Sequence, residues 1–146
     1  MNTTRLLQFS KQFHKFYTAR FAALLERRQL SMREMDVLLF LVNNPGYDTA
    51  RDITEFRGLS KSQVSQAVDL LTAEGLLQRT PDTADRRVIH LSLTEEGAPL
   101  AAEALAIQSA CVSQLLSGLS EQQREQLKLL LDIVLDNGSH LAEVVV

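Results

Sequence analysis

The chain has 146 residues, of which 45% are apolar and 23% are charged, values typical of one globular domain that can bury a core. Its apolar runs are far shorter than the roughly 20 residues of a membrane span, and it begins without a secretory leader, so we expect a cytoplasmic protein with no membrane contact. The net charge is −3, but residues 1–93 carry 13 Lys and Arg against 10 Asp and Glu, whereas residues 94–146 carry 2 against 8.

Apolar residues at steps of three and four predict a long amphipathic helix over residues 5–28, and similar spacing recurs along the chain. Helices are predicted over residues 5–28, 31–44 and 49–58 and from Ser60 to Gly75. Two further helices are predicted to begin at Thr94 and at Ser120. Several begin at a Ser or Thr that is followed three residues later by Glu, Asp or Gln, which is the spacing of a capping box. The third and fourth helices are separated by a short turn, as in a helix-turn-helix.

A β-hairpin is predicted after the fourth helix, with strands over residues 76–81 and 88–93 and a loop rich in Asp and Thr between them. In the second strand every other residue is aliphatic, so one face packs on the helices while the face of Val88, His90 and Ser92 is solvated. The fold prediction is one mainly α domain over 1–146, in which a helix-turn-helix lobe with a small β-wing (31–93) lies between long helices at 1–29 and 95–146.

Two stretches carry a family resemblance: SKSQVSQAVDLLTAEGLLQR, which covers residues 60–79, and DTADRRVIHLSLTEEG, which covers residues 82–97. With them, residues 30–97 resemble the winged helix-turn-helix of the MarR family of bacterial transcriptional regulators. The resemblance implies a homodimer held by the first and last two helices, a fourth helix that enters the DNA major groove, and a wing along the backbone or in the minor groove. It also implies a repressor more often than an activator, released by a small ligand or by oxidation.

The fourth helix turns Val64, Val68 and Leu71 inward and leaves polar side chains on its other faces. Hydroxyl and amide groups near a helix N-terminus can bind phosphates and base edges. We expect DNA contacts from this helix and from the paired arginines of the hairpin: Ser60, Lys61, Ser62, Gln63, Ser65, Gln66, Arg86 and Arg87. Taken without the family pattern, a capped, solvated helix and a solvated hairpin tip are the better explanation of these residues.

Asp69 is acidic and would repel phosphate, so we expect it to hold Arg86 or Arg87 and thereby to set the position of the wing. Neighbouring residues of a strand point to opposite faces, so one arginine turns inward and the other turns toward DNA. Parity with Ile89 aims Arg87 inward, but a loop residue need not follow strand parity, and the assignment stays open.

Three other groups of residues are candidate sites. Phe13, His14 and Tyr17 form part of an aromatic stripe that either lines a pocket for a small aromatic or apolar effector or packs against another helix. Cys111 lies on an apolar helical stripe, where core packing is expected rather than reactivity. No pair of histidines has the spacing of metal ligands, so we expect no metal, no cofactor and no enzyme activity.

Together with the resemblance, these residues lead us to expect a DNA-binding transcriptional regulator that binds double-stranded DNA at an inverted-repeat operator as a homodimer. The resemblance further implies a ligand-responsive repressor. The alternative is a winged-helix protein-interaction module that has lost DNA contact. Such a module would expose apolar side chains on the fourth helix and the wing, where the sequence instead has polar and basic residues.

Overall fold

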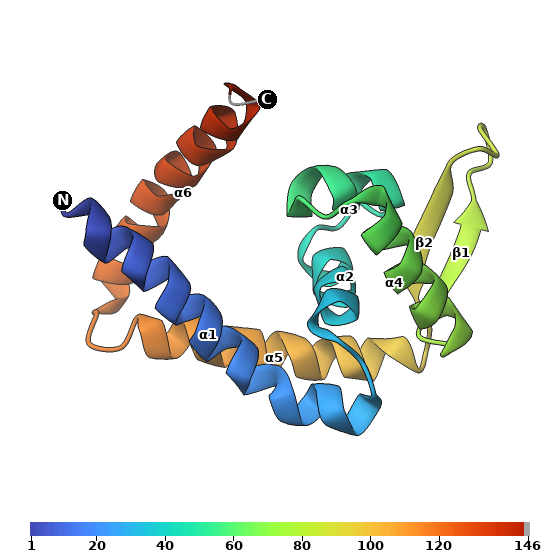
Figure 1. Ribbon diagram of the computed structural model, residues 1–146, viewed down its shortest axis with the longest axis horizontal. Helices are drawn as coiled ribbons and strands as arrows, with labels where there is room; N and C mark the ends of the chain where they lie inside the picture. Colours follow the sequence, from blue (N-terminus) through green and yellow to red (C-terminus); the bar gives the residue numbers. More distant parts are fainter. Residues whose placement is uncertain (145–146) are drawn as a thin grey trace. The chain divides into compact units, whose positions relative to one another are not determined.

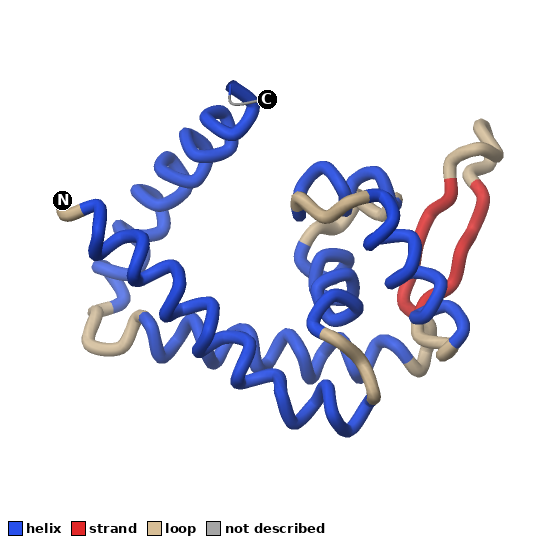
Figure 2. The backbone as a smooth tube through the Cα atoms, in the orientation of Figure 1, coloured by secondary structure: helices blue, strands red, loops and turns tan. Residues whose placement is uncertain are grey.

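The computed structural model describes residues 1–144 and divides into two compact units, Met1–Cys111 and a second unit that begins at Val112. Over the described residues the order of elements is α1 (Thr3–Arg28), α2 (Met32–Asn43), α3 (Ala50–Arg57), α4 (Lys61–Ala73), β1 (Leu77–Pro81), β2 (Ile89–Leu93), α5 (Gly97–Leu115) and α6 (Glu121–Val144) (Figures 1 and 2). The predicted fold class, mainly helical with a two-stranded wing, is confirmed, and the element bounds differ from the predicted ones by a few residues at most.

Residues at the helix ends explain where the helices begin. The Ser60 hydroxyl accepts the Gln63 N–H at 3.1 Å and the Gln63 side chain accepts the Ser60 N–H at 3.0 Å, so α4 begins with the predicted capping box. At the start of α5, the Thr94 hydroxyl accepts the Gly97 N–H at 3.0 Å and donates to the Gly75 carbonyl at 2.5 Å. This second pair joins the residues after α4 to the residues before α5, across the base of the hairpin.

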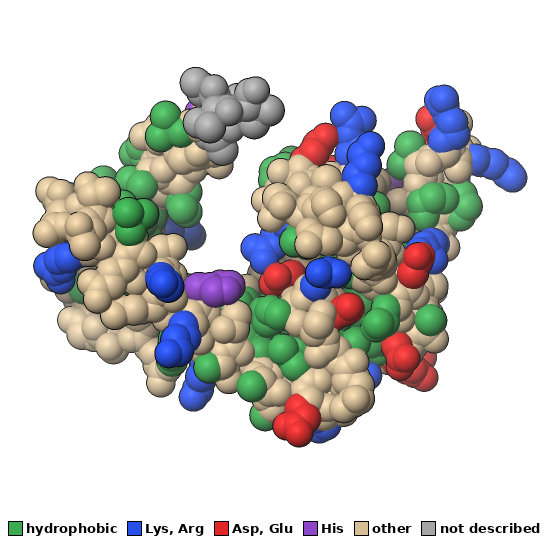
Figure 3. Space-filling view, in the orientation of Figure 1, with side chains coloured by type: hydrophobic (Ala, Val, Ile, Leu, Met, Phe, Trp, Pro, Cys, Tyr) green, Lys and Arg blue, Asp and Glu red, His purple; other side chains and the backbone are tan. Residues whose placement is uncertain are grey.

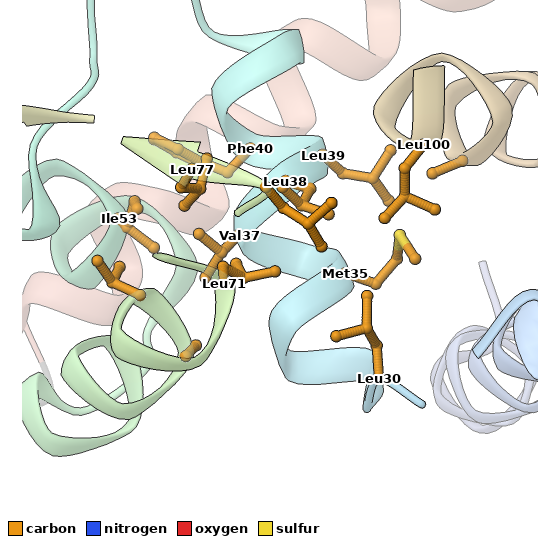
Figure 4. Packing of buried hydrophobic residues seen from close by; sticks show 14 of the residues in the cluster. Leu30, Met35, Val37, Leu38, Leu39, Phe40, Ile53, Leu71, Leu77 and Leu100 are labelled. Atoms are coloured by element: carbon orange, nitrogen blue, oxygen red, sulfur yellow. The ribbon is translucent and has the colours of Figure 1, made fainter. Parts of the chain in front are cut away.

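The core of the first unit is built around α2, which buries side chains on two sides. Figure 4 shows Leu39 directed toward Leu100 of α5, while Val37 lies toward Leu71 of α4 and Ile53 of α3. All five side chains are at most 3% exposed. Burial of an aliphatic side chain of this size stabilises a fold by about 1.5–3 kcal/mol, so α2 is the element that holds the other helices of the lobe together.

The hairpin is antiparallel, with Leu77 opposite Leu93, Arg79 opposite Leu91 and Pro81 opposite Ile89. Leu77 and Leu91 are 2% and 4% exposed, so one face of the hairpin packs on the helices as predicted. Since a two-stranded ribbon is marginal by itself in water, these contacts with the lobe stabilise the wing.

In the second unit, α6 begins after a Ser120–Gln123 capping box and carries many apolar side chains that are exposed in the single chain. Those more than 40% exposed are Leu129, Leu130, Leu131, Ile133, Val134, Leu135 and Leu141. Within residues 1–144, no helix combines the length and the apolarity that crossing a membrane would require.

Candidate nucleic-acid interface

The outer face of α4 is polar. Its buried side is formed by Val64, Val68 and Leu71, which are at most 3% exposed, as the sequence predicts. The side chains that are exposed on the rest of the helix include those of Lys61, Ser62, Ser65, Gln66 and Asp69. Because the N-terminus of a helix has unpaired N–H groups and a partial positive charge, this face suits an anion or a hydrogen-bonding base edge.

Ser60 and Gln63 differ from the other candidate residues of α4 because they bind each other in the capping box. Each uses one acceptor atom there, which leaves the Ser60 hydroxyl proton and the Gln63 side-chain amide group as donors. Their first role is therefore to begin α4, and any contact with a ligand uses these remaining donors.

The turn of the hairpin is ordered by its aspartates. One carboxylate oxygen of Asp82 accepts the N–H groups of Ala84 and Asp85 at 3.0 and 2.9 Å. Across the turn the Asp82 N–H donates to the carbonyl of Val88 at 2.8 Å, and the Val88 N–H donates to the carbonyl of Asp85 at 2.9 Å. The conformation of residues 82–88 is therefore set by local hydrogen bonds.

The two paired arginines have different surroundings. Arg87 donates from Nε and Nη2 to the two carboxylate oxygens of Asp85, at 3.0 and 3.1 Å, and this contact holds the pKa of Asp85 below its usual value. Within residues 1–144, Arg86 forms no hydrogen bond or ion pair. Figure 3 shows Lys and Arg side chains extending from the end of the hairpin into solvent. Of the two guanidinium groups, that of Arg86 has its charge available for an external anion.

Asp69 pairs with Arg79 of β1, so the prediction that it holds Arg86 or Arg87 is wrong. Arg79 follows the buried Leu77 by two residues and therefore lies on the face of the hairpin that packs on the helices. Arg87 lies in the turn before β2, so strand parity does not apply to it, and its guanidinium binds Asp85 within the turn.

His90 binds two carboxylates, although the sequence predicts it on the solvated face of β2. Its Nδ1 lies 2.7 Å from Asp48 Oδ1 and its Nε2 lies 2.8 Å from Asp82 Oδ1. The hydrogen bonds to Asp48 and Asp82 raise the pKa of His90 above its usual value. Nothing in the residue pattern identifies Asp48 as a partner, because it lies 42 positions earlier in the chain.

The structure brings Phe13 and Tyr17 together on α1 with ring centroids 6.0 Å apart, while the side chain of His14 is exposed. The Tyr17 hydroxyl accepts a hydrogen bond from the side chain of Gln108 on α5 at 2.9 Å. Burial raises the pKa of Tyr17. Cys111 is 0% exposed in the single chain, so the prediction that it packs in the core is confirmed.

The helix-turn-helix and hairpin have recognisable relatives. A model of the MarR family matches residues 28–88. The HTH-type transcriptional repressor MdtR of Bacillus subtilis (strain 168) is 34% identical over 102 residues, which cover 70% of this chain and 65% of MdtR. The chain belongs to the MarR family. The transcriptional repressor MprA of Escherichia coli (strain K12) is 37% identical to this MarR family chain over 71 residues. These residues are 49% of this chain, and they span only 40% of the length of MprA.

Solved structures extend the likeness of this MarR family chain to its long helices. The transcriptional regulator SlyA has a TM-score of 0.80 at 20% identity, with 97% of this chain and 99% of SlyA covered. A mutant of MepR from S. aureus, bound to an oligodeoxyribonucleotide, has a TM-score of 0.57 at 23% identity, with 94% of this chain and 98% of the MepR chain covered. Bordetella bronchiseptica BpsR, whose DNA binding is regulated by 6-hydroxynicotinic acid, has a TM-score of 0.66 at 22% identity. The alignment covers 89% of this chain and 98% of BpsR. At these identities the likeness establishes the fold.

Proposed function

We propose that this MarR family protein is a sequence-specific DNA-binding regulator, with α4 in the major groove and the hairpin along the DNA backbone. The observation that carries the proposal is the polar outer face of α4 together with the unpaired guanidinium of Arg86 on the hairpin. An interaction module would instead expose large apolar side chains on these two elements. The large apolar side chains exposed on α4 and the hairpin are Leu70 and Val88, and they are only 38% and 36% exposed.

The direction of regulation is proposed to be repression. The relatives MprA and MdtR are both named transcriptional repressors, and a MepR mutant has been solved with an oligodeoxyribonucleotide. A repressor acts where the DNA is, which agrees with the cytoplasmic location expected from the sequence.

The residues of the interface divide into two groups by chemistry. Ser65 and Gln66 are exposed beyond the first turn of α4, so they are assigned to base edges in the major groove. Phosphate contacts are assigned to the start of α4 and to the wing, through Ser60, Lys61, Ser62, Gln63, Arg86 and, where Asp85 releases it, Arg87. Asp69 acts indirectly, because its pairing with Arg79 joins α4 to β1.

The functional unit is proposed to be a homodimer formed by the helices of residues 1–29 and 95–146. The support is the exposed apolar surface of α6 and the exposed side chains of Leu6, Leu7, Phe9 and Phe16 on α1. A second copy related by a two-fold axis would cover such a surface, and it implies an inverted-repeat operator with half-sites about 10 base pairs apart. Light scattering at micromolar concentration tests this assembly, and a monomer would contradict it.

A small aromatic or apolar acid is proposed as the effector, bound near Phe13, His14 and Tyr17. The support is a half-buried aromatic surface with a polar end at Tyr17, together with the regulation of BpsR by an aromatic acid. Such a ligand releases DNA only if it binds the DNA-free arrangement more tightly. Calorimetric titration with a panel of aromatic acids tests this, and the absence of both heat and any change in DNA binding would contradict it.

The central experiment is a selection of bound sequences from random double-stranded DNA. We expect enrichment of one inverted repeat, and we expect Ser65→Ala protein to enrich it less strongly while it still binds DNA. If the folded wild-type protein enriches no sequence and binds no DNA at low salt, the interaction-module alternative becomes the better explanation.

A further inference from the structure

His90 connects the wing to the helical lobe through both of its ring nitrogens. Asp48, bound to Nδ1, lies in the loop between α2 and α3, and Asp82, bound to Nε2, is the first residue after β1. The carbonyl of Asp48 also accepts the N–H of Leu91 at 2.8 Å, so the same loop residue holds β2 by a backbone bond. Asp82 in turn organises the turn that carries Arg86.

The number of donors decides which form of His90 fits this arrangement. A neutral imidazole has one donor and one acceptor, whereas two ionised carboxylates offer only acceptors. Only the doubly protonated imidazolium donates to Asp48 and to Asp82 at the same time. The hydrogen bond from His90, together with the N–H groups of Asp85 and Ala84, holds the pKa of Asp82 below its usual range, so Asp82 remains ionised at neutral pH.

The other carboxylates on the neighbouring elements and on the turn already have partners. β2 packs against β1, α2 and α3. The pairs on these elements and on the turn are Arg79 with Asp69, Arg57 with Asp36, Arg51 with Glu55, Arg87 with Asp85, and Asp52 with the Thr49 cap of α3. The remaining charged side chains of α2, Arg33 and Glu34, lie at its first turn, where Glu34 binds Ser31. Asp48 and Asp82 are therefore the carboxylates that act on the imidazole.

We propose that His90 is a positioning residue for DNA binding and acts as a proton-dependent latch. Its imidazolium holds Asp82, and with it the turn that carries Arg86, to Asp48 in the loop before α3. Loss of the proton leaves one carboxylate facing a ring nitrogen that has no hydrogen, so the hairpin separates from the loop on that side. The effect on DNA rests on the function proposed above.

The sign of the pH dependence follows from the raised pKa of His90. The latch is closed below that pKa and opens as the pH rises through it. Opening also leaves an unpaired carboxylate beside the phosphate backbone, which opposes binding. Operator affinity is therefore expected to fall as the pH rises.

The test combines a titration of the free protein with a binding series on the selected operator. The chain has three histidines, so the NMR signal of His90 is assigned by its loss in His90→Gln. The dissociation constant is measured at constant salt between about pH 5.5 and 8.5, the range in which a histidine titrates. We expect the wild-type constant to rise by up to about tenfold per pH unit for each latch that opens.

Two variants separate the latch from a general loss of structure. Asp48→Asn offers an amide donor to a neutral ring nitrogen, so it should keep the hairpin in place and flatten the pH dependence. Arg86→Ala is the matched control on the same hairpin, and it should weaken binding while it keeps the wild-type pH dependence. His90→Gln should flatten the dependence as well, and circular dichroism checks that it is folded.

The outcomes distinguish the latch from the function on which it rests. A flat profile in Asp48→Asn and His90→Gln, with the wild-type slope kept in Arg86→Ala, supports the latch. The same slope in wild type and Asp48→Asn, or a His90 that titrates at the ordinary histidine value, overturns it even if DNA is bound. A wild-type protein that binds no DNA at any pH, with His90 titrating at a raised value, instead overturns the DNA-binding function and the role of the latch in it.

Discussion

Replacement of Arg86 by alanine should remove one phosphate contact from each wing without disturbing the fold. Within residues 1–144 the Arg86 side chain binds no other residue, so its truncation breaks no internal hydrogen bond. Arg87 offers the matched comparison, since its guanidinium is held by both carboxylate oxygens of Asp85. Loss of Arg87 removes a charge that is largely neutralised within the protein, and it also leaves Asp85 unpaired.

The magnitude follows from counterion release. Each phosphate contact contributes about 0.9 to the slope of log K against log salt, so a dimer with two wings loses about 1.8. Between about 50 and 200 mM salt this difference in slope changes the ratio of the wild-type to the mutant affinity by about tenfold. Because phosphate contacts carry no sequence information, operator and random DNA should be affected alike.

Fluorescence anisotropy with labelled operator and with labelled random duplex, across a salt series, measures both quantities. The expected result is a lower slope in Arg86→Ala on both DNAs and a smaller change in Arg87→Ala. An unchanged slope in Arg86→Ala, or a larger loss in Arg87→Ala, would refute the assignment of Arg86 as the phosphate-binding arginine.

Three further changes test other parts of the interface. Ser65→Ala should weaken operator binding by about 1–3 kcal/mol with little change in salt slope, and an equal loss on random duplex in the anisotropy assay would contradict its role at a base edge. Asp69→Ala breaks an exposed ion pair with Arg79 and should lower the free energy of unfolding by only about 0.2–1 kcal/mol in urea titrations, where a much larger loss would be unexpected. Gly97→Ala places a Cβ 2.0 Å from the carbonyl oxygen of Leu76, so the backbone must move, and a melting temperature equal to that of wild type would contradict this close approach.

Helix starts and the buried side of α4 could be predicted because their causes are local. Ser60 and Gln63 satisfy each other within one turn, and Val64 and Val68 lie on one face by helical spacing alone. Local hydrogen bonds of this kind need no knowledge of the rest of the fold. The same reasoning explains why the polar face of α4 was identified correctly.

The partners of Asp69 and His90 could not be predicted, because they depend on how separate elements meet. Charge alone suggested Arg86 and Arg87 as the ion-pair partners of Asp69. The observed partner is Arg79, because Arg79 lies on the strand face that packs on α4. For His90, strand alternation correctly placed it opposite the packed face. The alternation carries no information on the loop before α3, which supplies Asp48.

The wing is attached to the helical lobe by polar contacts at separate places along its length. Arg79 binds Asp69 near the middle of β1, and β2 is bound through Leu91 and His90 to the single loop residue Asp48. The last two contacts belong to the loop that precedes α3 and not to α4. A change in that loop would therefore act on β2 directly, while β1 keeps its contact with α4 through Arg79 and Asp69. In the proposed function α4 contacts base edges and the hairpin contacts phosphates, so the spacing of these two elements is a property through which a signal can act on DNA binding.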